Sequence, residues 1–126
     1  MENQTIRAAL DQHWSASAEG DLDAEHEIYH DDVVVEYPQS GERICGRRNI
    51  QALRGHHPSK LGFTILRVLG SGDLWVTEYV ISYDERAVYT VGIMEFRDGK
   101  VTRETQYFAD PFGPPAWRAQ WVEWME

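Results

Sequence analysis

Apolar side chains recur at helical spacing near the N-terminus of this chain. Over residues 3–17, one face of the expected helix carries Ile6, Leu10, His13, Trp14 and Ser17. Charged residues lie largely off this face, and Gly20 follows as a helix terminator. The pattern predicts an amphipathic helix whose apolar face packs against the rest of the protein.

The pattern then changes to a shorter helix and a strand. Asp21 is a favoured N-cap residue and predicts a short helix that continues to about Tyr29. Residues 33–37 are β-branched or aromatic apart from one Glu, which is typical of a strand. Because Pro38 cannot donate to a ladder, we expect that strand to end there.

The second half of the chain has the pattern of a sheet. Residues 39–46 are typical of a turn and short connection, and residues 47–54 predict a modest helix. Four strand-like runs follow at 63–69, 75–83, 87–96 and 101–108. The connections between these runs are short, which favours antiparallel neighbours. The order of elements therefore predicts an α+β fold with N-terminal helices and a meandering sheet.

Composition narrows the class of protein. A chain of 126 residues with 42% hydrophobic and 26% charged residues is typical of a single globular domain, here residues 1–126. It has no apolar run long enough to cross a membrane, and its first residues do not resemble a secretory signal. The single cysteine, Cys45, cannot form an internal disulfide, so we expect a soluble protein of the cytoplasm.

The charge argues against two classes of partner. The formal net charge is −9, which repels phosphate backbones and anionic lipid head groups. The basic residues form no run longer than Arg47-Arg48. We therefore expect no nucleic-acid partner and no membrane partner.

Three passages carry a resemblance to a known family. They are "DDVVVEYPQSGERICG" at 31–46, "MEFRDGKVTRETQYFADPF" at 94–112 and "PAWR" at 115–118. With the order of helices and strands, they resemble the SnoaL-like branch of the nuclear transport factor 2 superfamily, which includes polyketide cyclases, ketosteroid isomerase and limonene epoxide hydrolase.

The resemblance spans nearly the whole chain and implies a cone-shaped, cystatin-like α+β barrel. In such a fold the helices pack inside a strongly curved antiparallel sheet, around a ligand cavity, and homodimers are frequent. The resemblance does not imply one reaction, because this fold also hosts non-catalytic binding modules.

The turn at 98–99 allows two strand registers, either a two-residue turn or a type I turn followed by a glycine bulge. The bulge register, which we adopt, pairs Val88, Thr90 and Gly92 with Phe108, Gln106 and Glu104. We adopt it because the resemblance to limonene epoxide hydrolase implies a pocket on that face. The alternation of side chains then sends Thr105 and Tyr107 to the other face.

The candidate chemistry is proton transfer by a carboxylate. Limonene epoxide hydrolase has an Arg and two Asp residues at the positions of Tyr79, Ile81 and Gln106, which disfavours epoxide hydrolysis here. A ketosteroid isomerase-like reaction needs a carboxylate near a proton donor. The sequence offers as acids and donors Glu36, Glu104, Asp110, Tyr79 and Tyr83, and no spacing fixes their arrangement.

Each candidate catalytic residue also has a structural interpretation. Glu104 is a pocket acid in the bulge register and a solvated strand charge without the bulge. His13 either moves a proton or is a buried histidine whose ring nitrogen is hydrogen-bonded. Asp110 precedes a proline and is typical of a turn cap. Glu36 lies on the strand face opposite Val35 and Tyr37, and we expect its side chain to face the solvent.

Two further residue groups carry little chemical signal. His56 and His57 are adjacent, so their side chains diverge, and no third ligand has suitable spacing for a metal. Cys45 has arginines nearby but no histidine and acid partner that would make it a nucleophile.

The aromatic residues point to ligand binding. The expected substrate-binding residues are Trp14, Glu36, Tyr79, Ile81, Tyr83, Val88, Thr90, Gln106 and Phe108. Three tryptophans recur in the Pro-rich segment 111–126, and we expect this segment to cover the sheet, the pocket mouth or a second subunit.

Three functions remain open on this reading. In the first, a pocket carboxylate isomerises, cyclises or cleaves a small apolar carbonyl compound without a cofactor. In the second, the same cavity binds a ligand without turnover and the sheet pairs two chains. A purely structural module would instead fill the cavity with its own side chains.

Overall fold

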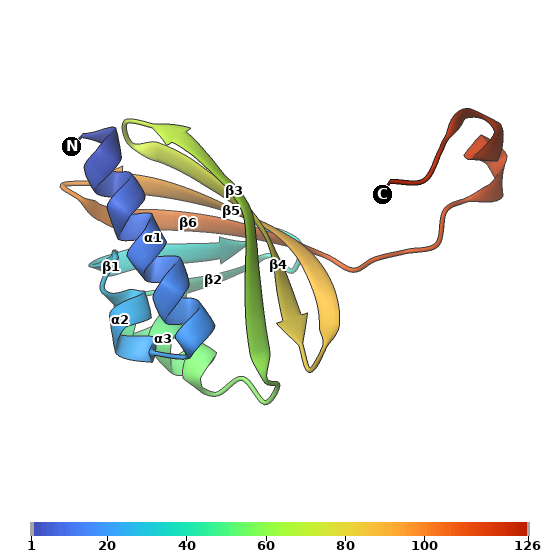
Figure 1. Ribbon diagram of the computed structural model, residues 1–126. Helices are drawn as coiled ribbons and strands as arrows, with labels where there is room; N and C mark the ends of the chain where they lie inside the picture. Colours follow the sequence, from blue (N-terminus) through green and yellow to red (C-terminus); the bar gives the residue numbers. More distant parts are fainter. Residues whose placement is uncertain (1, 126) are drawn as a thin grey trace.

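Three helices and a six-stranded sheet form the body of the protein. The structure is a computed structural model that describes residues 2–125 (Figure 1). The helices are α1 (Asn3–Glu19), α2 (Leu22–His26) and α3 (Arg47–Gly55). The strands are β1 (Tyr29–Tyr37), β2 (Glu42–Cys45), β3 (Leu61–Ser71), β4 (Leu74–Tyr83), β5 (Arg86–Arg97) and β6 (Lys100–Ala109), and a 3-10 helix, η1 (Ala116–Trp121), follows. The expected α+β class is confirmed.

The sheet is mixed, which corrects the expectation of an antiparallel one. The strand order is β2-β1-β6-β5-β4-β3, and β1 pairs with β6 in parallel while every other pair is antiparallel. The short hairpin connections from β3 to β6 produce the predicted meander. The parallel pair joins distant parts of the chain, because β2, α3 and the strands β3 to β5 all lie between β1 and β6 in the sequence.

The hairpin between β5 and β6 differs from the register that we adopted. Asp98 and Gly99 have φ angles of 52° and 79° and form the two-residue turn, whose central residues both need positive φ. The extra residue is Thr102, which lies in a bulge on β6 between the pairs Phe96↔Val101 and Glu95↔Arg103.

The expected pairs are therefore wrong by two residues. The structure pairs Thr90 with Phe108, Gly92 with Gln106 and Met94 with Glu104. Because a shift of two residues preserves the side-chain face, Glu104 and Gln106 still point inward and are buried.

The core lies between α1 and the inner face of the sheet. Leu10 on α1, Val33 and Val35 on β1, Ile50 on α3 and Val101 on β6 have no measurable exposure. From Trp75 to Ser82, β4 alternates between buried and half-buried residues, with Trp75 and Tyr79 inward. The periods of 3.6 and 2 in the sequence thus correspond to the faces that pack together.

Two local elements depart from the sequence prediction. The side chain of Asp21 caps α2 as expected by accepting from the Ala24 amide, but that helix ends at His26 and not near Tyr29. The residues of β2 were expected to form part of a turn and short connection. The strand has only four residues, and half of them are charged. Pairing with β1 supplies the order that its own sequence does not.

The segment after β6 does not cover this chain's own sheet or cavity. From Pro111 onward the chain extends away from the body and ends in the turn of η1 (Figure 1). In this structure, residues 111–125 therefore lie apart from the sheet and the cavity of their own chain.

Hydropathy gives one further result for the helices. Within residues 2–125, no helix combines the length and apolar character that a membrane crossing requires.

Two leucines of different burial test this packing. Leu10 is fully buried, whereas Leu69 on β3 is 55% exposed. We expect Leu10→Ala to lower the free energy of unfolding by about 2–5 kcal/mol, because it leaves a cavity in the core. Leu69→Ala should change it by less than about 1 kcal/mol. Urea unfolding followed by circular dichroism measures both, and equal losses would contradict this description of the core.

Candidate functional site

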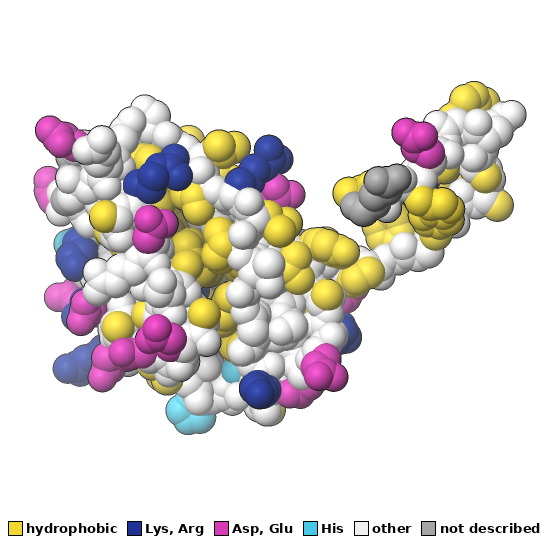
Figure 2. Space-filling view, in the orientation of Figure 1, with side chains coloured by type: hydrophobic (Ala, Val, Ile, Leu, Met, Phe, Trp, Pro, Cys, Tyr) yellow, Lys and Arg dark blue, Asp and Glu magenta, His cyan; other side chains and the backbone are white. Residues whose placement is uncertain are grey.

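A cavity of about 420 Å³ lies between the helices and the inner face of the sheet. Its walls come from α1, α2, α3 and the inward residues of β3, β4 and β6. In Figure 2, hydrophobic side chains gather in the hollow beside α1. This space is large enough for a small organic molecule, and it argues against a module whose interior is filled by its own side chains.

Glu104 is the acid of this cavity. The residue has no exposure and comes from β6, whose bulge sets its inward direction. Its Oε1 accepts a hydrogen bond from the Tyr29 hydroxyl at 2.5 Å and lies 3.4 Å from Arg54 Nη2. Its Oε2 is buried and has no hydrogen-bond partner among the described residues. A buried carboxylate oxygen without a donor is free to exchange a proton or to bind a ligand.

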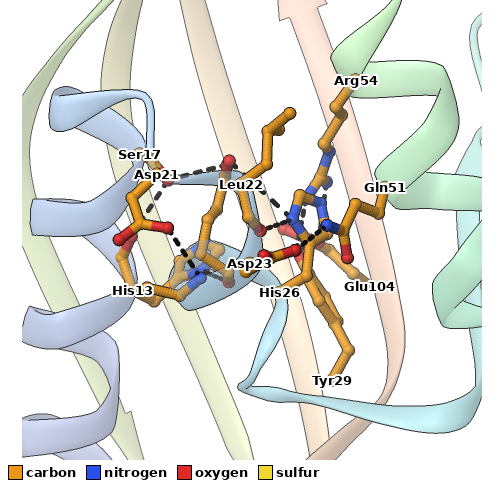
Figure 3. A network of polar contacts seen from close by, with 12 residues as sticks. His13, Ser17, Asp21, Leu22, Asp23, His26, Tyr29, Gln51, Arg54 and Glu104 are labelled. Carbon is orange, nitrogen blue, oxygen red and sulfur yellow. Dashed lines mark hydrogen bonds and ion pairs between the residues drawn. The ribbon is translucent and has the colours of Figure 1, made fainter.

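Arg54 connects Glu104 to Tyr29 and His26 (Figure 3), and it also reaches Gln106. Its Nη1 donates to the Tyr29 hydroxyl at 2.9 Å and to His26 Nε2 at 3.2 Å, and its Nη2 reaches Gln106 Oε1 at 3.5 Å. Since arginine keeps its charge in proteins, the site contains a fixed cation beside the acid.

A second polar pair lies next to Glu104. Gln106 Nε2 donates to the Tyr79 hydroxyl at 2.7 Å. The hydroxyl proton of Tyr79 has no acceptor in the hydrogen bonds of the described residues. Burial raises the pKa of Tyr79, and the charge of Glu104 raises it further. Tyr79 is therefore a protonated donor available to a ligand oxygen.

Gly92 on β5 makes room for this pair of side chains. A Cβ atom at this position would lie 3.3 Å from Glu104 Oε2 and 3.6 Å from the Tyr79 hydroxyl. The absence of a side chain on the inner face of β5 therefore lets the carboxylate and the phenol share one small volume.

Burial controls the protonation of Glu104. It raises the pKa of the carboxyl, while the Arg54 charge and the Tyr29 hydrogen bond lower it and do not cancel the effect. Burial also raises the pKa of Tyr29, which stays protonated and donates. A carboxyl whose pKa lies above its usual range is a stronger proton acceptor than an ordinary carboxylate, which suits it to acid–base catalysis.

Two buried histidines lie on the helix side of the cavity, and both are neutral. His26 Nδ1 donates to the Leu22 carbonyl, so its Nε2 is the acceptor for Arg54. Burial and the Arg54 charge lower its pKa to about 4. His13 Nδ1 donates to the Glu25 carbonyl at 2.6 Å, and burial lowers its pKa to about 3. The ring of His13 is thus buried, and one of its two nitrogens is hydrogen-bonded.

Glu25 is a second carboxylate on the cavity wall. It comes from α2, and its Oε2 accepts a hydrogen bond from Ser17 Oγ at 2.8 Å. The helix α1 holds Ser17 one turn beyond His13 (Figure 3), and Ser17 also donates to the His13 carbonyl. The helix wall and the sheet wall of the cavity therefore each carry one acid.

The structure brings most of the expected site residues together. Those that line the cavity are His13, Trp14, Tyr79, Ile81, Tyr83, Glu104, Gln106 and Phe108. Trp14 packs on Tyr79 with ring centroids 4.5 Å apart, and its Nε1 is buried with no partner among the described residues.

Four expected residues do not line this cavity. Glu36 lies on the outer side of β1 and pairs with Arg103 and Arg43, because strand alternation turns it away from Val35. Asp110 is exposed and pairs with Arg86 at 2.8 Å beyond the end of β6.

The other two lie on the inner face of β5. Thr90 is buried, and its hydroxyl donates to the Val88 carbonyl. Val88 lines a separate shallow pocket beside Phe108 and Asp110.

Sequence reasoning missed four residues of the site, Glu25, His26, Tyr29 and Arg54. On α3, Leu53 is 43% exposed at the cavity, and its neighbour Arg54 reaches the acid. The charged and polar residues of α2 gave no apolar signal. The only available clue was Tyr29, an aromatic residue at the start of a β-branched strand.

The described residues offer no evident metal site. Across residues 2–125, no three His, Cys, Asp or Glu side chains come together in a way that would hold a metal ion. Cys45 is exposed.

The chain belongs to the SnoaL-like domain family, which matches residues 10–104. Its fold is that of nuclear transport factor 2-like proteins. A solved NTF-2 like protein of unknown function from Burkholderia xenovorans is 61% identical, with 100% of this chain and 99% of that chain aligned at a TM-score of 0.91.

Two further solved structures show the breadth of the fold. A proposed ketosteroid isomerase from Kribbella flavida is 24% identical, with 98% of this chain and 91% of that chain aligned at a TM-score of 0.89. An LEH-like epoxide hydrolase from M. tuberculosis is 26% identical, with 85% of this chain and 84% of that chain aligned at a TM-score of 0.67. No curated protein matches the chain.

The neutral His13 predicts a loss of stability in acid. The unfolded chain takes up a proton near the ordinary pKa of 6.5, whereas the folded chain does so only near 3, so stability falls as pH drops through this window. The raised pKa of Glu104 has the opposite effect, because this group stabilises the folded chain more as pH falls.

His13→Asn isolates the histidine, since the amide can keep the bond to the Glu25 carbonyl. Relative to the wild type, we expect this variant to gain about 2–3 kcal/mol of unfolding free energy between pH 6.5 and 4.5. Urea unfolding at several pH values measures the difference, and parallel curves for the two proteins would contradict it.

Proposed function

We propose that this protein binds a small, largely apolar carbonyl compound and moves a proton on it with Glu104. The observation that carries the proposal is the buried Oε2 of Glu104, which has no hydrogen-bond donor among the described residues and belongs to a residue that lines the cavity. The aromatic wall formed by Trp14, Phe63, Tyr83 and Phe108 suits an apolar ligand body.

The proposed step is the removal of a proton from the carbon next to the carbonyl. Ionised Glu104 accepts the proton at Oε2, the C–H electron pair forms a carbon–carbon double bond, and the carbonyl π pair moves to the oxygen. Tyr79 donates its free hydroxyl proton as a hydrogen bond to that oxygen. Where the ligand has a carbon–carbon double bond between the β and γ carbons, Glu104 returns the proton to the γ carbon. The oxygen pair then restores the carbonyl, the double bond moves into conjugation with it, and ionised Glu104 is regenerated.

The neighbours of Glu104 fit this role. Arg54 and Tyr29 hold Oε1, which fixes the carboxylate and leaves Oε2 to react. The Arg54 charge also lowers the pKa of the acid and so opposes the effect of burial. His13 does not serve as the oxygen's donor here, because its Nδ1 proton is already bonded to the Glu25 carbonyl and its ring is neutral.

A second candidate function is binding without turnover. The contacts that fix Oε1 of Glu104 would equally stabilise an acid with a purely structural role. The unpartnered Trp14 Nε1 could donate to a ligand oxygen without any transfer of a proton. The two functions share the cavity and differ only in whether Oε2 exchanges a proton with the ligand.

Glu104→Gln separates the two functions. We expect this variant to bind the same ketones as the wild type and to lose about 10²–10⁴-fold in the rate of proton exchange, since the amide cannot act as the base. The assay screens aromatic and alicyclic ketones by thermal shift and then follows deuterium uptake at the carbon next to the carbonyl by proton NMR.

The matched control is Glu36→Gln, which removes the same charge from the outer side of the sheet. It should leave the exchange rate unchanged. Exchange that persists in Glu104→Gln would refute the catalytic role, and ligands that bind both proteins without any exchange would assign the binding function.

A further inference from the structure

Glu25 is a buried carboxylate that the proposed proton transfer does not use. The residue is 8% exposed and lines the same cavity as Glu104. Its hydrogen-bond partner Ser17 lies on α1, on the opposite side of the polar network from Arg54 and Glu104 (Figure 3). The cavity therefore has a second polar region, away from the acid that we propose as the base.

The two oxygens of Glu25 share a single donor. Oε2 accepts a hydrogen bond from Ser17 Oγ at 2.8 Å, and Oε1 accepts none from the described residues. The Ser17 hydroxyl also lies 3.0 Å from the His13 carbonyl. Because a hydroxyl has only one proton to donate, it serves only one of these two acceptors at a time. Buried polar groups are normally hydrogen-bonded, so the carboxylate of Glu25 is incompletely satisfied.

Glu25 also lacks a cationic partner among the described residues. The one basic side chain within ion-pair distance is His26, whose Nδ1 lies 3.9 Å from Glu25 Oε1. That nitrogen donates its proton to the Leu22 carbonyl, and the ring is neutral. Arg54 forms its ion pair with Glu104 instead. Because buried charges in proteins are normally paired, the contacts of Glu25 leave a place for a cation from outside the chain.

A protonated amine satisfies both requirements of this carboxylate. An ammonium group brings a positive charge and three N–H donors. A hydroxyl brings one donor and no charge, and charge-assisted hydrogen bonds are roughly twice as strong as neutral ones. The side chain of Glu25 lines the cavity and remains partly accessible, so a ligand amine can reach it.

The remainder of the cavity accommodates the body of such a ligand. Its volume of about 420 Å³ has room for a ring, and the aromatic side chains of Trp14, Phe63 and Tyr83 line it. A ligand with an aromatic ring between its amine and its carbonyl therefore matches both the polar and the apolar parts of the lining.

We infer that the ligand of this cavity is an amino ketone whose protonated amine binds Glu25 while its carbonyl lies at Tyr79 and Glu104. Glu25 is then a specificity-determining residue and takes no part in the proton transfer. The place of the carbonyl rests on the function proposed above, whereas the amine site rests on the contacts of Glu25 alone.

Three ketones of matched size test the amine site. They are para-(aminomethyl)acetophenone, para-(hydroxymethyl)acetophenone and para-ethylacetophenone, which differ only in a terminal ammonium, hydroxyl or methyl group. Isothermal titration calorimetry near neutral pH measures their affinities for the full chain. The wild type should bind the amine at least about 10-fold more tightly than the ethyl compound, with the hydroxyl compound in between.

Three variants locate the amine. Glu25→Gln keeps the size of the side chain but removes its charge, so the preference for the amine should fall to within about 3-fold. Asp23→Asn is the matched control, because it removes one charge from the same short helix at an exposed residue that bonds Gln51 and does not line the cavity. It should keep the wild-type preference. Glu104→Gln should also keep it, because the amine lies at the other acid.

The outcomes separate this inference from the proposed proton transfer. Equal wild-type affinities for the amine and either of the other two compounds would overturn the inference without any variant. It would also fail if the preference for the amine survived Glu25→Gln, or if Asp23→Asn or Glu104→Gln removed it. An intact preference without deuterium exchange would overturn only the proton transfer, whereas failure of all three ketones to bind would overturn both proposals.

Discussion

The buried contact among Glu104, Arg54 and Tyr29 is the constraint on which the rest of this structure depends. It joins the last strand, the third helix and the first strand in one set of hydrogen bonds. Burying charges is unfavourable unless they are paired, and removing one partner of a buried pair costs roughly 3–5 kcal/mol. The three elements therefore have to meet in one arrangement, and that arrangement also produces the cavity.

The chemistry of the site depends on the one oxygen of Glu104 that this contact leaves without a hydrogen bond. Arg54 and Tyr29 both contact Oε1 of Glu104, and Oε2 has no donor among the described residues. Gly92 and Tyr79 then define the small volume around the free oxygen. A carboxylate with both oxygens hydrogen-bonded would have only a structural role. The unpaired oxygen therefore distinguishes this pocket from an ordinary packed core.

Much of the fold could be predicted from the sequence, because periodicity reports burial. The helix at α1 and the meander from β3 to β6 follow directly from the spacing of apolar residues. Glu104 and Gln106 were placed inward for an incorrect reason, since two different bulges preserve the same face. Arg54, Glu25 and His26 were missed because polar residues that meet only in the folded chain leave no periodic signal. The parallel pairing of β1 was missed because it joins distant parts of the chain.

That distant pairing also sets an order of assembly. Tyr29 and Glu104 are 75 positions apart, so closing their contact carries a large loop entropy, while the hairpins of β3 to β6 close locally. A nascent meander would present an unpaired edge of β6, with the backbone groups that β1 later engages still hydrated. Docking of the amino-terminal half onto that edge expels this water and removes the acid from contact with the solvent.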